Sequence, residues 1–191
     1  MIPQKVLEYL RIPKEHWNAS LDQIPEKCPH KKALIGYIDN LVDNIRSPKN
    51  LLLSGTYGVG KSAIGSILLK TAAEKRILGC WVTARNLPKY EIEKVMFDEN
   101  MTMLERLTTA PVIVLDELLL QVGDQRYTEQ SAEWLIRARA ENCLCTIITT
   151  NLTWKAIEER YPALHSVLEA RTGGLTVSGH AFRKEIRKQL K

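Results

Sequence analysis

The sequence predicts an α/β fold in which a parallel sheet is covered by helices on both faces. Three observations support this prediction. A glycine-rich segment, residues 55–62, lies between a short apolar run and a helical pattern. Apolar runs that suit buried strands alternate with helical segments, as expected of parallel strands joined by crossover helices. One of these runs, residues 112–115, is followed directly by two acidic residues, which predicts a polar site at one edge of the sheet.

The composition is that of a globular protein of one domain. The 191 residues suffice for a full hydrophobic core. No apolar run approaches the roughly 18 residues that a membrane span requires, and the N-terminus lacks the apolar core of a signal peptide. We therefore expect a cytoplasmic protein with no membrane partner. The four cysteines include no C-x-x-C pair, which favours free, reduced thiols over a zinc site.

The elements follow from the N-terminus in a readable order. Residues 1–32 form a polar leader with four prolines, and residues 33–45 carry apolar side chains at helical spacing. The run 50–53 suits a buried strand, and the helix that begins at Lys61 is expected to stop at Gly79. Further strands are expected at residues 80–84, 112–115, 146–150 and 175–177. Helices are expected between them, at residues 88–108 (a charged insert), 128–141, 153–160 and 163–172.

The glycine-rich segment fits the phosphate-binding P-loop, G-x-x-x-x-G-K-[ST]. Its glycines let backbone N–H groups converge on phosphate oxygens, and the following helix adds partial positive charge at its N-terminus. Lys61 is expected to reach the β- and γ-phosphates of ATP, and the Ser62 hydroxyl to bind Mg²⁺. The predicted nucleotide-binding residues are Gly55, Thr56, Tyr57, Gly58, Val59, Gly60, Lys61 and Ser62.

Polar residues follow two of the predicted strands at their carboxyl ends, where ligands bind in open α/β sheets. Asp116 is expected to support Mg²⁺ through water, and Glu117 to act as general base on the attacking water. Asn151 follows the strand at 146–150 and would orient that water beside the γ-phosphate. Alternatively, Asn151 caps the next helix, although Thr153 could also do so.

Two arginines have a structural and a functional interpretation. Arg171 ends the helix predicted at 163–172, where it could simply interact with the helix dipole or act as an arginine finger in a neighbouring subunit's site. Arg139 shares a helical face with apolar residues and therefore needs a partner. That partner would be an internal carboxylate or a neighbouring subunit, and we favour the carboxylate.

The two ends of the chain leave alternatives open. Val6, Tyr9 and Leu10 share a possible helical face, which could bind a partner or pack on the core. The basic segment 180–191 has apolar residues at helical spacing and could contact nucleic-acid phosphates or form a solvated helix.

Taken together, these motifs resemble the AAA+ ATPases, and among them the DnaC/DnaI helicase-loader and IstB group. The resemblance covers roughly residues 12–185. It implies a three-layer sandwich with a five-stranded parallel sheet and no C-terminal helical lid. It divides the chain into a leader (1–32) that could bind a partner and an ATPase domain (33–191). It also implies that Trp17 and Asn18 lie near the nucleotide base, and that Arg171 is an arginine finger.

The same resemblance implies a function. The chain would be an ATP- and Mg²⁺-dependent ATPase that loads a replicative DNA helicase. It would bind single-stranded DNA, in part through the insert at 88–108, and would self-associate or join a mixed ring of AAA+ partners. The alternatives are an IstB-like helper of a DNA transposase, a P-loop kinase, and a non-hydrolysing regulator of another loader's ring.

Overall fold

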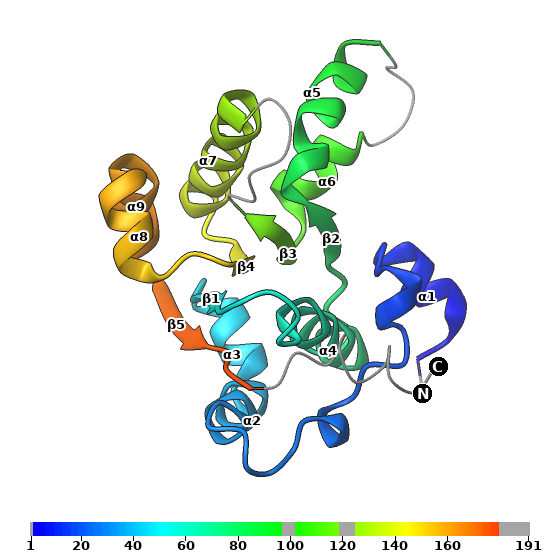
Figure 1. The fold of residues 1–191 in the computed structure, drawn as a ribbon. Coiled ribbons are helices and arrows are strands. Elements are labelled where there is room, and N and C mark those ends of the chain that lie inside the picture. The colour runs from blue at the N-terminus through cyan, green and yellow to red at the C-terminus, as the bar shows by residue number, and fades with distance from the viewer. Residues whose placement is uncertain (1, 97–101, 119–124, 180–191) are drawn as a thin grey trace, which may run out of the picture.

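The computed structural model describes residues 2–96, 102–118 and 125–179 (Figure 1). Its strands form one parallel sheet in the order β2-β3-β4-β1-β5. The strands are β1 (Asn50–Ser54), β2 (Cys80–Thr83), β3 (Val112–Leu118), β4 (Cys145–Thr150) and β5 (Thr172–Thr176). The predicted α/β fold with a five-stranded parallel sheet is therefore confirmed. Within the described ranges, no helix is long and apolar enough to cross a membrane.

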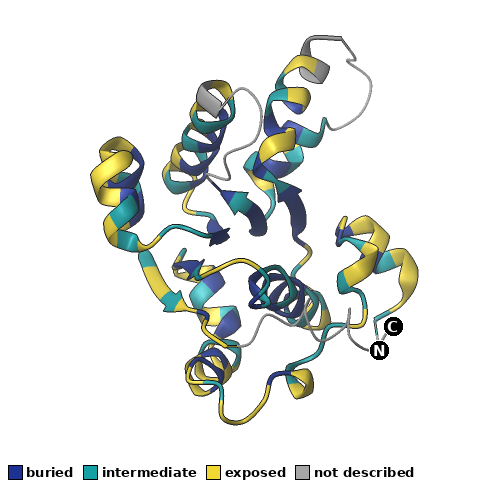
Figure 2. Cartoon of the chain, viewed as in Figure 1, coloured by how far each residue is buried: buried dark blue, intermediate teal, exposed yellow. Residues whose placement is uncertain are grey.

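Helices cover both faces of the sheet, and alternate strand residues pack into two separate cores. Leu51 and Leu53 of β1 belong to one core, together with α2 (Lys31–Asp39), α3 (Leu41–Arg46) and α4 (Lys61–Glu74). Leu52 belongs to the other core, which the helices of the second half of the chain complete. Figure 2 shows β1 to β4 as a mostly buried layer between helices whose outer faces are exposed, whereas the edge strand β5 is largely exposed.

The second face of the sheet is covered by the helices that follow β2 in the chain. They are α5 (Leu87–Met96), α6 (Met103–Thr109), α7 (Gln125–Glu141), α8 (Trp154–Arg160) and α9 (Pro162–Glu169). The expected insert thus contains two helices, α5 and α6. Thr102 begins α6 with a capping box, because its hydroxyl accepts from Glu105 N–H while the Glu105 carboxylate accepts from Thr102 N–H. Residues 97–101 and the basic segment 180–191 lie outside the described residues.

Several predicted boundaries are wrong, and three of them have a clear local cause. The helix expected at 33–45 is divided at Asn40, whose side-chain amide donates to the Gly36 carbonyl and competes with the backbone pattern. Helix α4 ends before Gly79, because Arg76 adopts a left-handed conformation (φ 62°) and Ile77 N–H bonds back to Ala72. Strand β5 begins earlier than expected, since Gly173 and Gly174 pair with β1 rather than break the strand.

The leader packs on the core instead of extending from it. Helix α1 (Gln4–Tyr9) and the turn after it bury Leu7 and Leu10, whereas Tyr9 stays exposed. The carbonyl of Leu10 accepts a hydrogen bond from Trp81 N–H, so the leader covers the free edge of β2. Of the two interpretations of the N-terminal helical face, the structure supports packing on the core. The short helices η1 (Lys14–His16) and η2 (Leu21–Gln23) then carry the leader across α4.

Arg139 of α7 is fully buried, and its partners correct the expectation of a carboxylate. Its guanidinium donates to the hydroxyl of Thr146 and to the backbone carbonyls of Leu107, Ala110 and Cys145, at 2.5–3.0 Å. Burial lowers the pKa of Arg139 to about 10, which still leaves the group charged at neutral pH. The planar fork of arginine suits this role because it offers several donors in fixed directions. Arg139 thus ties α6, α7 and β4 together.

We expect Arg139→Met to lower the free energy of unfolding by about 2–5 kcal/mol, because several buried acceptors lose their donor. Arg137 on the same helix provides the matched control, since it is half exposed and pairs with Glu133 one turn away. Arg137→Met should change stability by about 0.5 kcal/mol or less. Urea unfolding of both variants measures the difference, and equal midpoints would contradict this account of Arg139.

Candidate functional site

The P-loop connects the carboxyl end of β1 to the N-terminus of α4. Gly58 and Gly60 have φ values of 78° and 98°, a left-handed conformation that glycine adopts without steric cost. Gly55 is required for a different reason. A Cβ atom at this position would lie 2.2 Å from the carbonyl oxygen of Val177, the residue after β5. Two features thus fix the loop: the left-handed conformations of its glycines and the close approach of Gly55 to the chain after β5.

Lys61 is buried at the start of α4, and its ammonium group closes the loop. Its Nζ donates to the carbonyls of Gly55 (2.9 Å) and Thr56 (2.8 Å), and to Oδ1 of Asn151 (2.7 Å). These acceptors connect the P-loop with the residue that follows β4. A phosphate group in the loop would offer the ammonium stronger, charged acceptors in the same region.

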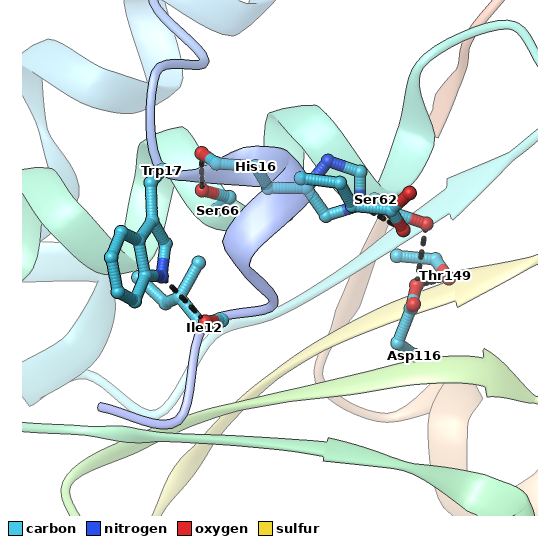
Figure 3. A network of polar contacts seen from close by, with 8 residues as sticks. Ile12, His16, Trp17, Ser62, Ser66, Asp116 and Thr149 are labelled. Carbon is cyan, nitrogen blue, oxygen red and sulfur yellow. Dashed lines mark hydrogen bonds and ion pairs between the residues drawn. The ribbon is translucent and has the colours of Figure 1, made fainter. Parts of the chain in front are cut away.

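Ser62 and the carboxylate of Asp116 lie in direct contact (Figure 3). The Ser62 hydroxyl donates to Oδ1 of Asp116 at 2.9 Å, and the Thr149 hydroxyl donates to the same oxygen at 2.5 Å. Asp116 is buried, so these hydrogen bonds replace the water that its charge would otherwise require. The cluster therefore contains hydroxyl and carboxylate oxygens from α4, β3 and β4.

Glu117 is positioned by an irregularity in the sheet. The pairing of β3 with β4 shifts between Leu115 and Leu118, so β3 contains one extra residue at this point. Glu117 has a φ of 59°, which is unusual for a residue with a side chain and costs on the order of 1–3 kcal/mol. Its N–H donates to Oγ1 of Thr149 at 3.0 Å, which holds the bulge. As a result Asp116 faces Ser62, while Glu117 faces the cavity.

A cavity of about 460 Å³ runs from these residues to the leader. The P-loop from Tyr57 to Ser62, Glu117 and Asn151 line one end. The leader and α4 line the other end through His16, Asn18, Ala19, Ile24, Ile64 and Ile67. One end is therefore polar and rich in backbone N–H groups, whereas the other end combines isoleucines with a few polar side chains. Such a cavity suits an elongated ligand with charged groups at one end and a flat, partly apolar group at the other.

The structure separates the two leader residues predicted near the base. Asn18 lines the cavity. Trp17 does not line the cavity, contrary to the prediction that placed it beside the base. The Trp17 indole packs against the hydrophobic core and donates to the carbonyl of Ile12 at 2.8 Å. Because the chain turns at η1, neighbouring side chains of the leader point to different sides.

Asn151 contacts Lys61, as described above, and does not cap the next helix. Thr153 fills that role, since its hydroxyl accepts a hydrogen bond from Ala156 N–H at the start of α8. Asn151 is therefore not the helix cap, which was the alternative that the sequence left open. It lies at the carboxyl end of β4, beside the P-loop.

Arg171 lies far from this cavity, at the opposite edge of the sheet. Its carbonyl accepts from Asn50 N–H at the start of β1, whereas the P-loop follows the end of that strand, about 16 Å away at the rise of a β-strand. The side chain is exposed and donates to the carbonyl of Ala140 at 3.3 Å. It follows α9 rather than ending it, because the helix stops at Glu169. Arg171 therefore cannot reach the cavity of its own chain.

Sequence reasoning missed several residues of the site. Thr149 holds the Asp116 carboxylate and the bulge at Glu117. The only sequence signal for this role is its position near the end of the strand predicted at 146–150. His16 and His30 line the cavity from the leader. Burial lowers the pKa of His30, whose Nδ1 accepts from Ser178 N–H at 3.4 Å. No motif marked these histidines, because contacts between distant segments set their positions: His16 with α4, and His30 with Ser178 after β5.

The P-loop after β1, the acidic end of β3 and the strand order define a P-loop fold of the AAA+ type. Two solved structures with clear similarity share this fold. The DnaC helicase loader matches with a TM-score of 0.71 and 24% identity over 87% of this chain and 100% of its own. DnaI matches with a TM-score of 0.70 and 20% identity over 87% of this chain and 94% of its own.

A replication initiator has a similar fold. AMPPCP-bound DnaA from Aquifex aeolicus matches with a TM-score of 0.67 and 13% identity over 94% of this chain and 56% of its own. No protein-family model matches the sequence, and no curated protein sequence matches it. The expected resemblance to loader-type AAA+ proteins is thus found in the fold, and the function has to be argued from the site.

Proposed function

We propose that this protein is an ATPase of the helicase-loader type. The observation that carries the proposal is the convergence of Lys61, Ser62, Asp116, Glu117 and Asn151 on one end of a cavity whose other end suits a base. ATP would lie along this cavity, with its phosphates in the P-loop and its adenine between α4 and the leader. The similarity to DnaC and DnaI structures supports the loader class rather than another P-loop class.

The residues of the cluster fit a magnesium ion. Mg²⁺ prefers hard oxygen ligands and usually keeps several waters. The Ser62 hydroxyl and the Asp116 carboxylate provide such oxygens within hydrogen-bond distance of each other. When bound, the ion would neutralise charge on the β- and γ-phosphates. Thr149 would hold the Asp116 carboxylate in place through its hydrogen bond.

Hydrolysis follows from the placement of the remaining side chains. Glu117 accepts a proton from a water molecule while the water oxygen bonds to the γ-phosphorus and the bond to the β-phosphate oxygen breaks. Asn151 orients this water, and Lys61 stabilises the phosphate oxygens. ADP and inorganic phosphate leave, and the proton on Glu117 is released to solvent.

Arg171 would complete the site of a neighbouring subunit. Its place at the opposite edge of the sheet excludes action on the nucleotide of its own subunit, and its exposure leaves it accessible to a second copy. This supports an assembly in which ATP lies between subunits, as self-association or as a mixed ring. Nucleotide state would then control the grip on single-stranded DNA and on a replicative helicase.

A binding experiment at one stated salt concentration tests the loader class. The protein is titrated into labelled single-stranded and duplex DNA with ATP, with ADP and without nucleotide, and anisotropy is measured. In parallel, the host's replicative helicase is captured with tagged protein. We expect ATP-dependent binding to the single strand together with helicase capture. Preference for duplex DNA without helicase capture would favour a transposition helper.

A further inference from the structure

The leader wall of the cavity is attached to α4 by polar contacts from one face of that helix. Ser66, which is fully buried, donates its hydroxyl hydrogen to the carbonyl of His16 at 2.9 Å (Figure 3). One turn further along, the ammonium group of Lys70 donates to the carbonyls of His16 (3.4 Å), Trp17 (2.9 Å) and Ala19. Lys70 is half buried and does not line the cavity itself.

The number of donors matches the number of acceptors. An ammonium group has three N–H donors, and three carbonyls of the leader converge on it. These carbonyls belong to the last residue of η1 and to the irregular segment that follows it, which no strand or long helix pairs through its backbone. Burial lowers the pKa of Lys70, and the nearby Glu74 opposes that change. The three carbonyls replace hydrogen bonds that the ammonium group would otherwise make with water.

The contacts hold the leader so that part of it lines the cavity. With three carbonyls directed at Lys70, the segment places His16, Asn18, Ala19 and Ser20 along the cavity. Opposite them lie Ile64 and Ile67 of the same helix. Lys61, six residues before Ile67, holds the other end of the cavity. Helix α4 therefore positions both ends of the cavity, through Lys61 at one end and Lys70 at the other.

We propose that Lys70 is a positioning residue that sets the base-binding wall, and thereby the preference of the site for a nucleoside triphosphate over triphosphate alone. This inference rests on the proposed nucleotide binding. It assigns to Lys70 an effect on the base end of the ligand, without an effect on the phosphate end. A lysine that only stabilised the fold would affect both ends equally.

The test compares Lys70→Met with Lys75→Met, which removes an exposed lysine near the end of the same helix. Dissociation constants are measured for ATP and for inorganic tripolyphosphate with each protein. We expect Lys70→Met to weaken ATP binding about tenfold and to leave tripolyphosphate binding within about twofold of the unaltered protein. Lys75→Met should leave both unchanged. Lys70→Arg, which keeps several donors, should restore most of the ATP affinity.

Hydrogen exchange without nucleotide gives an independent readout. The amides of Trp17 and Ala19 bond within the leader, to Lys14 and His16, and should exchange faster in Lys70→Met, whereas those of α4 should not. Unchanged ATP affinity, an equal loss for both ligands, or no recovery in Lys70→Arg would overturn the inference. If the unaltered protein binds tripolyphosphate as tightly as ATP, the leader does not form a base-binding wall and the inference is refuted. Binding of neither ligand would instead refute the proposed function.

Discussion

Replacing Lys61 with alanine should weaken ATP binding by about 100-fold or more. Charge-assisted hydrogen bonds to phosphate contribute about 1.5–3 kcal/mol each, and every 1.4 kcal/mol corresponds to a factor of ten in affinity. Lys61 also joins the P-loop to Asn151, so its loss would leave the loop carbonyls and the amide without their shared donor. A titration with a fluorescent ATP analogue measures the effect.

The control must separate lost binding from lost folding. Lys75→Ala removes an exposed lysine from the end of the same helix and should leave ATP affinity unchanged. Thermal unfolding without nucleotide should show that Lys61→Ala remains folded. Normal ATP affinity in a folded Lys61→Ala protein would remove the P-loop from the proposed site.

The second large effect concerns Glu117 and Arg171, whose replacement should slow hydrolysis without weakening ATP binding. Glu117→Gln should bind ATP normally and hydrolyse it about 10²–10⁴ times more slowly, because the amide cannot accept the proton from water. Arg171→Ala should also bind ATP normally, with turnover lower by about 10³–10⁵ if it acts as a finger. Each variant alone would be nearly inactive.

Mixing the two variants distinguishes action between subunits from a structural role. A Glu117→Gln subunit still carries Arg171, and an Arg171→Ala subunit still carries Glu117. Where they adjoin in the right order, one complete site forms, so an equimolar mixture should regain a substantial part of the normal turnover. Arg160→Ala, which removes an exposed arginine from the end of α8, serves as the control and should stay active. A mixture that remains inactive would leave Arg171 as a partner of Ala140 and α7.

Local patterns in the sequence were enough to predict the sheet and the edge at which its polar strand ends meet. Three short apolar runs are each followed by polar residues: the run before the P-loop, the run before Asp116 and the run before Asn151. The structure brings these polar residues together. The ends meet because a parallel sheet places all strand ends of one kind at the same edge.

Contacts between distant segments could not be predicted in this way. The partners of Arg139 are mainly backbone carbonyls, which every residue carries, so no side-chain pattern identifies them. The same applies to Lys70, whose acceptors lie about fifty residues earlier in the leader. The bulge at Glu117 depends on the pairing register of β3 with β4, and Trp17 was misplaced because the turn at η1 decides where it points.

The central claim is that ATP is hydrolysed at a site completed by a second subunit. ATP turnover per subunit is therefore measured across a titration of protein concentration, with and without single-stranded DNA. We expect turnover per subunit to rise steeply with protein concentration, and to rise further with the DNA. Turnover that is constant per subunit and indifferent to DNA would contradict the claim and favour an enzyme that acts as a monomer, such as a P-loop kinase.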